Sequence, residues 1–259
     1  MENAGNIFYY ENSVTGKGEI ENLIAHEIAH QWFGNSASEK DWHHVWLSEG
    51  FATYFTLVYN EFTYGPDKLM EGLLKDRAIV INHCTRAPAP VIDTRITEYP
   101  MLLSPHVYQR GSWVLHMLRQ EVGDDGFWKG IRNYYERYRD SNALTSDFRL
   151  VMEEASGKQL EAFFNQWLEE ANLPDFTGHW TYNPTDKSVT LTLDQVQPGR
   201  VFDLSLEIGV YGGTTDKPEI RPIKINQKST KISFPAAIKP VKIELDPQVR
   251  LLFKGNLRN

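Results

Sequence analysis

The chain has 259 residues, 41% of them hydrophobic and 24% charged, and a formal net charge of -7. This composition is typical of a folded globular protein, and the length allows two ordinary domains. The negative charge argues against nucleic-acid binding, which requires a basic surface patch. No apolar run approaches the roughly 18 residues of a membrane-spanning helix, and the N-terminus lacks the features of a signal peptide. The single cysteine excludes an intramolecular disulfide and leaves the compartment open.

The chain up to about residue 175 carries apolar residues at helical spacing. Gly34 and Gly123 are well placed to end two of the predicted helices. Segment 87–105 contains four prolines, and we expect an ordered, irregular loop there. Helices are predicted over residues 18–34, 47–62, 67–83, 104–123, 126–138, 145–157 and 160–172.

After Pro174 the pattern changes to short alternating runs separated by turn-forming clusters. Such runs are typical of a small antiparallel β-sandwich. The sequence therefore predicts an α+β chain of two domains, a mainly helical one over 1–175 and a β-sandwich over 176–259. The predicted strands are 178–182, 188–193, 202–211, 218–225, 231–235 and 241–246.

The motif HEIAH carries two histidines, His26 and His30, at positions that lie on one face of a helix. Both imidazoles can therefore reach one zinc ion. Glu27 stands beside them, where its carboxylate can take a proton from a water that zinc activates. A pattern this short also arises by chance on an ordinary amphipathic helix, so a third ligand has to support it.

Glu49 is the candidate third ligand. A catalytic zinc site needs three protein ligands and one open position. The 18 residues between His30 and Glu49 are enough for the chain to turn and bring a second helix back to the first. No histidine follows at the short spacing of the elongated metzincin motif, which excludes that alternative. A His, His, Glu set predicts a zinc hydrolase.

The segment HEIAHQWFGNSASEKDWHHVWLSEGFATY resembles the zinc signature of the M1 family of aminopeptidases. This gluzincin family includes aminopeptidase N and leukotriene A4 hydrolase. The resemblance implies a thermolysin-like catalytic domain with one Zn²⁺ on His26, His30 and Glu49, and Glu27 as the catalytic base. The family often has Asn or Asp where this chain has Ser48, a difference that we expect to touch no ligand.

Two further segments fit the same family. Met1-Glu2-Asn3 resembles the end of its G-x-M-E-N exopeptidase motif, which implies that Glu2 binds the free α-amine of the substrate. A buried carboxylate there rejects an internal amide, because the carboxylate would be left unpaired. Tyr108, followed by Arg110 and a glycine, resembles the family's tyrosine motif. This resemblance implies that Tyr108 stabilises the oxyanion formed during hydrolysis.

The resemblance is strong over residues 1–60 and 105–125 and weak in the β-rich part. Family members carry a large β-rich domain ahead of G-x-M-E-N. The resemblance therefore implies that this chain is a fragment lacking that N-terminal β domain. The expected activity is that of a zinc metallo-aminopeptidase, which hydrolyses the N-terminal peptide bond of peptides with a free N-terminus through a metal-activated water. Two alternatives stay open: an epoxide hydrolase of the leukotriene A4 hydrolase type, and a zinc-binding fragment with little or no turnover.

Other polar residues have weaker claims. His106 and Arg110 flank Tyr108, and we expect either packing or a place in the pocket. His43 and His44 lie between the ligands in sequence, but nothing supports a second metal site. Cys84 has no partner cysteine and is expected to be an ordinary thiol.

Overall fold

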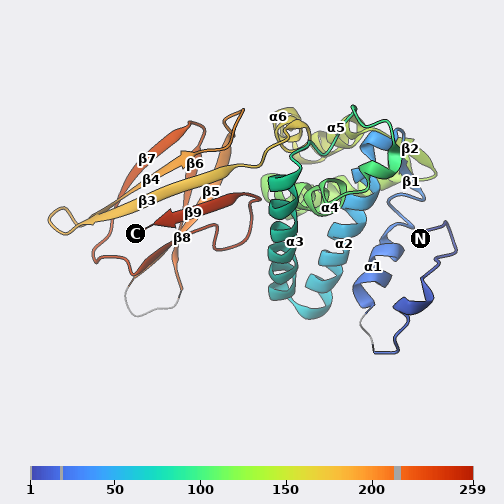
Figure 1. Cartoon of the computed structure of the whole chain (residues 1–259), viewed down its shortest axis with the longest axis horizontal. Coiled ribbons are helices and arrows are strands. Elements are labelled where there is room, and N and C mark those ends of the chain that lie inside the picture. The colour runs from blue at the N-terminus through green and yellow to red at the C-terminus, as the bar shows by residue number, and fades with distance from the viewer. Residues whose placement is uncertain (1, 18–19, 213–216, 259) are drawn as a thin grey trace. The chain divides into compact units, whose positions relative to one another are not determined.

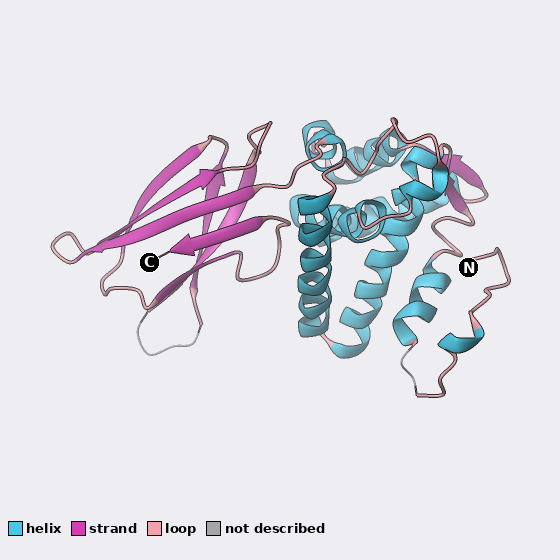
Figure 2. Cartoon of the chain, in the orientation of Figure 1, coloured by secondary structure: helices cyan, strands magenta, loops and turns pink. Residues whose placement is uncertain are grey.

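The computed structural model describes residues 2–17, 20–212 and 217–258. The chain divides into two compact units, Met1–Ala171 and Asn172–Asn259. The first is mainly helical and the second is built of strands (Figures 1 and 2), so the predicted mixture of helix and strand is confirmed. The domain boundary after residue 175 and the packing of a sandwich stay predictions. In the described part of the chain, no helix is long and apolar enough to cross a membrane.

The helical unit is built around α2, which packs against α1, α3 and α4 (Figure 1). Three of its aromatic side chains, Trp46, Phe51 and Tyr54, are completely buried in the core. The described helices are α1 (Glu21–Ala29), α2 (Trp46–Tyr64), α3 (Pro66–Arg86), α4 (Gly111–Tyr138), α5 (Thr145–Ser156) and α6 (Glu161–Phe164), with π-helical turns at His106–Arg110 and Asn165–Glu169. Short 3₁₀ turns lie at Glu11–Ser13, Trp42–His44 and Tyr99–Leu102, and β1 (Ala37–Glu39) pairs in parallel with β2 (Ser141–Ala143).

The end of α1 differs from the prediction. Residues 18 and 19, where the predicted helix begins, lie outside the described residues, and α1 ends at Ala29 rather than near Gly34. The chain turns back here because the Asn35 amide donates to the His30 carbonyl. Gly34 has a φ of 121°, and a Cβ at this position would lie 2.3 Å from Oγ of Ser48. The glycine therefore allows a tight turn against α2 instead of capping a helix.

α4 follows the prediction of two helices more closely. Its backbone leaves helical geometry at Gly123, with φ 76° and ψ 160°, which is where the sequence predicts a helix end.

The start of α4 is in close contact with α2. Gly111, the first residue of α4, meets Gly50 of α2. A Cβ on Gly50 would lie 3.0 Å from Cα of Gly111 and 3.1 Å from the carbonyl oxygen of Val107. The two backbones are thus in direct contact.

The proline-containing segment 87–105 forms an irregular loop, and Arg110 fixes it. The Arg110 side chain is completely buried. Its guanidinium donates to the carbonyl of Ala89 at 3.0 Å in the loop and to that of Trp167 at 3.2 Å. It also donates to the carbonyls of Glu170 and Ala171. Arg110 is therefore a packing residue in this fold and does not line the pocket.

The second unit contains two sheets. Burial alternates along each, as Val189, Leu191 and Leu193 show in β4. One sheet has the order β7 (Ser229–Pro235), β4 (Ser188–Gln195), β3 (Asp175–Asn183), β9 (Lys254–Arg258), and the other has the order β6 (Glu219–Ile225), β5 (Leu204–Tyr211), β8 (Lys242–Leu245).

The antiparallel prediction is wrong for one pair of strands. β9 was not predicted, and it runs parallel to β3 along the sheet edge. A parallel neighbour is reached only through a long connection, and here the whole unit intervenes between the two strands. Sequence patterns identify hairpins between neighbouring strands, but they carry no signal for such a distant pairing.

Replacing Arg110 tests its anchoring role. Arg110→Leu leaves four buried or part-buried carbonyls without their donor, so we expect the free energy of unfolding to fall by about 3 kcal/mol. Urea denaturation followed by far-UV circular dichroism measures this loss. Arg137→Leu is the control, because Arg137 pairs with Glu154 at an exposed site and such pairs contribute little. Equal stability of the two variants would contradict the anchoring role.

Candidate metal centre

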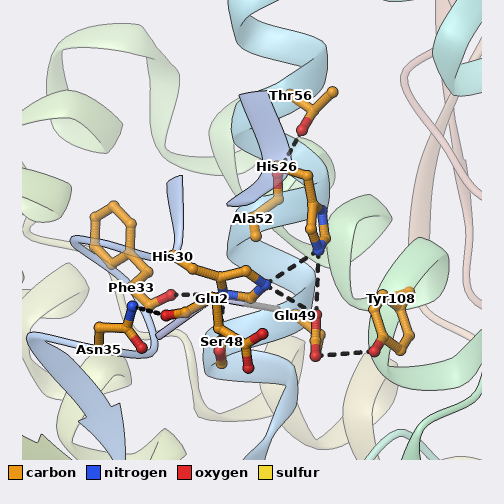
Figure 3. Close-up of polar contacts among 10 residues, drawn as sticks. All are labelled: Glu2, His26, His30, Phe33, Asn35, Ser48, Glu49, Ala52, Thr56 and Tyr108. Carbon is orange, nitrogen blue, oxygen red and sulfur yellow. Dashed lines mark hydrogen bonds and ion pairs between the residues drawn. The ribbon is translucent and has the colours of Figure 1, made fainter. Parts of the chain in front are cut away.

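His26 and His30 lie at the end of α1 and point into one site (Figure 3). Their Nε2 atoms are 3.1 Å apart, and His30 is 1% exposed. Nδ1 of His30 lies 3.1 Å from the carbonyl oxygen of Phe33, which only accepts hydrogen bonds. Nδ1 therefore carries a hydrogen, and Nε2 faces His26 and Glu49. A backbone carbonyl that fixes the tautomer of a histidine in this way is a common arrangement behind metal ligands.

Glu49, in the first turn of α2, completes the cluster. Its Oε2 lies 3.3 Å from Nε2 of His26 and 3.2 Å from Nε2 of His30, and the three ligand atoms lie within 4.8 Å of one another. Burial raises the pKa of Glu49, but the neighbouring imidazoles and Tyr108 outweigh it and lower this pKa to about 2. A charged carboxylate and the Nε2 atoms of two imidazoles thus converge on one point. Two histidine nitrogens and a carboxylate oxygen are ligands that zinc prefers, so this donor set fits a zinc ion.

Tyr108 lies on the π-helical turn and faces the cluster from the other side of Glu49 (Figure 3). Its hydroxyl donates to Oε1 of Glu49 at 2.9 Å, and its ring stacks on that of His26. Burial and the negative charge of Glu49 raise the pKa of Tyr108. The phenol therefore keeps its proton and acts as a hydrogen-bond donor beside the site.

Glu27 and Glu2 lie in the same region. Glu27 is on α1 and only 8% exposed, whereas Glu2 is half-buried and lies on the His30 side of the cluster (Figure 3). The negative charges of both contribute to the raised pKa of Tyr108. Met1, the first residue of the predicted exopeptidase motif, lies outside the described residues. The structure thus brings His26, His30, Glu49 and Tyr108 into contact, with Glu2 beside the cluster and Glu27 next to His26 in the chain.

Gln31 and Asn35 are two residues that the sequence did not single out. Asn35 donates from its side chain to the carbonyl of Glu2, and Gln31 accepts from the amide of Gly5 at 2.9 Å. Gln31 also donates to the carbonyl of Asn3. The turn after α1 therefore holds the segment that carries Glu2. The signal was present in QWFGN, but spacing alone does not reveal what the polar side chains contact.

The expectation that Ser48 touches no ligand is wrong. Its Oγ lies 3.1 Å from Nδ1 of His30, so it shares that nitrogen with the Phe33 carbonyl. His106 lies outside the cluster. Its Nε2 donates to the carbonyl of Ala87, and its Nδ1 lies 3.8 Å from Sγ of Cys84. Burial lowers the pKa of His106 to about 4, which keeps this ring neutral.

His43 and His44 also stay out of the cluster. Nδ1 of His43 lies 2.6 Å from Asp41, and its Nε2 reaches the Ile96 carbonyl. His44 contacts Oγ1 of Thr145 at 2.8 Å. Among the residues that the structure describes, His26, His30 and Glu49 are the one group arranged to hold a metal.

Comparison with known families agrees with this geometry. The model of the peptidase family M1 domain matches residues 1–167. The chain belongs to peptidase family M1. This M1 chain is 32% identical to aminopeptidase N of Lactococcus lactis over 194 residues, a match that covers 67% of the chain and 22% of that protein.

Other relatives give the same picture. The chain is 29% identical to human glutamyl aminopeptidase, with 74% of the chain and 21% of that protein covered. It is 27% identical to probable aminopeptidase 1 of Sulfurisphaera tokodaii, with 98% of the chain and 34% of that protein covered. This M1 chain therefore spans between about a fifth and a third of these relatives.

A solved structure shares the fold. The crystal structure of Legionella pneumophila aminopeptidase A in complex with aspartic acid superposes with a TM-score of 0.75 at 18% identity. The match covers 92% of this M1 chain and 27% of the other. At this identity the likeness concerns the fold alone.

Metal binding can be tested through stability. Zn²⁺ at 100 times its dissociation constant is expected to add about 2.7 kcal/mol to the free energy of unfolding. Glu49→Gln removes the charged ligand, and we expect it to abolish most of this gain, as measured by thermal unfolding with and without Zn²⁺. His43→Ala, which removes a histidine outside the cluster, is expected to keep the gain. The same gain in Glu49→Gln as in the parent chain would rule out this ligand set.

Proposed function

We propose that the chain is the catalytic part of a zinc metallo-aminopeptidase, which removes the N-terminal residue of peptides with a free α-amine. The observation that carries the proposal is the convergence of His26, His30 and Tyr108 on the carboxylate of Glu49. Membership of family M1 supports it. Because the chain spans a minor part of its relatives, the activity of the whole protein is included in this proposal.

The proposed mechanism assigns one task to each residue. His26, His30 and Glu49 would hold the Zn²⁺, which when bound supplies a Lewis acid that polarises the peptide carbonyl and makes water a better nucleophile. Glu27 accepts the proton of the attacking water and passes it to the leaving amine. Tyr108 donates a hydrogen bond to the developing oxyanion. Glu2 pairs with the α-ammonium group and so sets where the peptide is cut.

We also propose that residues 1–175 form a thermolysin-like catalytic domain and residues 176–259 a β-sandwich. Alternating burial in β4 and β5 supports a sandwich. Each sheet then has one apolar face, and the two apolar faces can be buried against each other. A Cβ on Gly255 of β9 would lie 3.3 Å from the Leu245 side chain of β8, so the two sheets touch at this point.

Hydrolysis of a panel of aminoacyl-p-nitroanilides tests the activity. We expect turnover of the unblocked substrates, loss of turnover with a zinc chelator, and none with N-acetylated substrates, because Glu2 needs a charged amine. Glu2→Gln is expected to weaken the preference for a free amine more than it lowers kcat. Bound zinc without any turnover would favour the zinc-binding fragment, and turnover of an epoxide alone would favour an epoxide hydrolase.

The role of Tyr108 has its own test. Tyr108→Phe removes one oxyanion donor, so we expect kcat to fall about 10²–10³-fold with little change in KM. Tyr135→Phe is the control, since its hydroxyl contacts Ser36 away from the site. Steady-state kinetics on an unblocked substrate gives both constants. A fall that appears in KM alone would assign Tyr108 to substrate binding instead of oxyanion stabilisation.

A further inference from the structure

A cavity of about 730 Å³ lies between α1, α2 and α3 and extends away from the metal centre. His26 and Tyr108 line one part of it, and Thr53 and Thr56 line the α2 side. The volume is in the range of ordinary ligand pockets, about 300–1,000 Å³. The cavity therefore has room for a side chain next to the reacting groups.

Most polar side chains around this cavity have a partner. Tyr64 donates to Glu21 at 2.7 Å, and Asn60 donates to Asn22 at 3.0 Å. Thr56 donates to the carbonyl of Ala52. Lys68 and Glu71 form an ion pair at 2.7 Å on α3. These groups satisfy one another without a ligand.

Asp76 differs from these groups because it is buried without a partner. It lines the cavity from α3, is 9% exposed, and has its Oδ2 fully enclosed without a hydrogen-bond partner. Within the described ranges, no donor reaches this carboxyl group. Burial raises the pKa of Asp76 to about 7, and the charge of Lys75 offsets only part of this effect. A buried, unpaired carboxyl group costs stability, and a cationic hydrogen-bond donor in the cavity would offset that cost.

The other charges around the cavity balance one another. Apart from Asp76, the cavity is lined by two carboxylates and two ammonium groups, and Lys68 is paired with Glu71, so Asp76 itself supplies the charge that a cation would meet. The titratable groups that face the cavity with Asp76 are Lys68, Glu71 and Lys75 on α3, Glu21 and His26 on α1, Tyr64 on α2 and Tyr108.

The position of Glu2 gives the direction of the peptide. Glu2 does not line this cavity, and it lies on the His30 side of Glu49, whereas Tyr108 lies on the other side (Figure 3). With the α-amine of the substrate at Glu2, the chain after the scissile bond runs past His26 and Tyr108 into the cavity. This step rests on the proposed function.

We propose that Asp76 is a specificity-determining residue, which binds a lysine or arginine side chain downstream of the scissile bond. The ammonium or guanidinium group donates to the Asp76 carboxylate, and the aliphatic stem lies along Leu57 and Ile79, which line the same cavity. The preferred substrates are accordingly peptides with a basic residue just after the N-terminal one.

Direct binding tests this proposal without relying on turnover. The peptides are Ala-Lys-Ala and Ala-norleucine-Ala, which have similar length and differ in the ammonium group. We expect the zinc-loaded chain carrying Glu27→Gln to bind the lysine peptide about tenfold tighter by isothermal titration calorimetry at pH 8 and low salt. Adding Asp76→Asn is expected to remove this preference, whereas Asp67→Asn, the same change on an exposed part of α3, is expected to keep it.

Proton release provides a second readout that a purely structural role would not change. A cation beside Asp76 favours its charged form, so the lysine peptide is expected to release more protons at pH 7 than the norleucine peptide. Titrations in buffers of different ionisation enthalpy measure the difference. This comparison uses the unaltered carboxyl group, and it therefore holds even where Asp76→Asn fails to fold. Equal affinity and equal proton release for the two peptides would overturn the proposal.

The outcomes for the two proposals are separable. A lysine preference that depends on Asp76, in a chain that hydrolyses no aminoacyl substrate, supports the cation site and counts against the aminopeptidase. Turnover of unblocked substrates together with equal affinities overturns the cation site and leaves the aminopeptidase intact.

Discussion

Two glycines, Gly50 and Gly111, meet where α2 crosses the π-helical turn ahead of α4, and the candidate site depends on this contact. A Cβ on Gly50 would lie 3.0 Å from the backbone of Gly111, so any larger residue pushes the two segments apart. Glu49 directly precedes Gly50. Tyr108 lies on the π-helical turn, which ends directly before Gly111. The backbone contact therefore sets the 2.9 Å hydrogen bond between their side chains. A site of this kind needs such rigid support, because a small misplacement of a catalytic group costs much of the rate.

Arg110 supports the same turn from behind. Its buried guanidinium binds four backbone carbonyls, which ties the turn to loop 87–105 and to the segment after α6. The tyrosine and the basic residue of one short motif thus serve different purposes. Tyr108 faces the site, and Arg110 fixes the position of Tyr108 without reaching a substrate. Sequence proximity to a site residue is therefore a poor guide to function here, because adjacent side chains on a helical turn point in different directions.

The metal cluster could be predicted because its signals are local. His26 and His30 are one helical turn apart, and Glu49 begins the next predicted helix, so periodicity alone brings two ligands together and makes the third plausible. Contacts between distant segments could not be predicted in this way. Three such contacts depend on how the elements pack, which spacing along the chain does not encode. They are the contact of Ser48 with His30, the hydrogen bond from Asn35 to Glu2 and the parallel pairing of β9 with β3.

Glu49 and Asp76 show how the fold separates two carboxyl groups by their surroundings. Imidazoles and a phenol lower the pKa of Glu49 to about 2, so this group contributes stability at neutral pH that is lost only as the pH falls towards that value. Burial without a partner raises the pKa of Asp76 to about 7, above its unfolded value of about 3.9. Its contribution is therefore full below about pH 4 and is lost as the pH rises through 7. Glu49 is ready to hold a cation at any physiological pH, whereas Asp76 becomes fully charged there only when a cation comes to it.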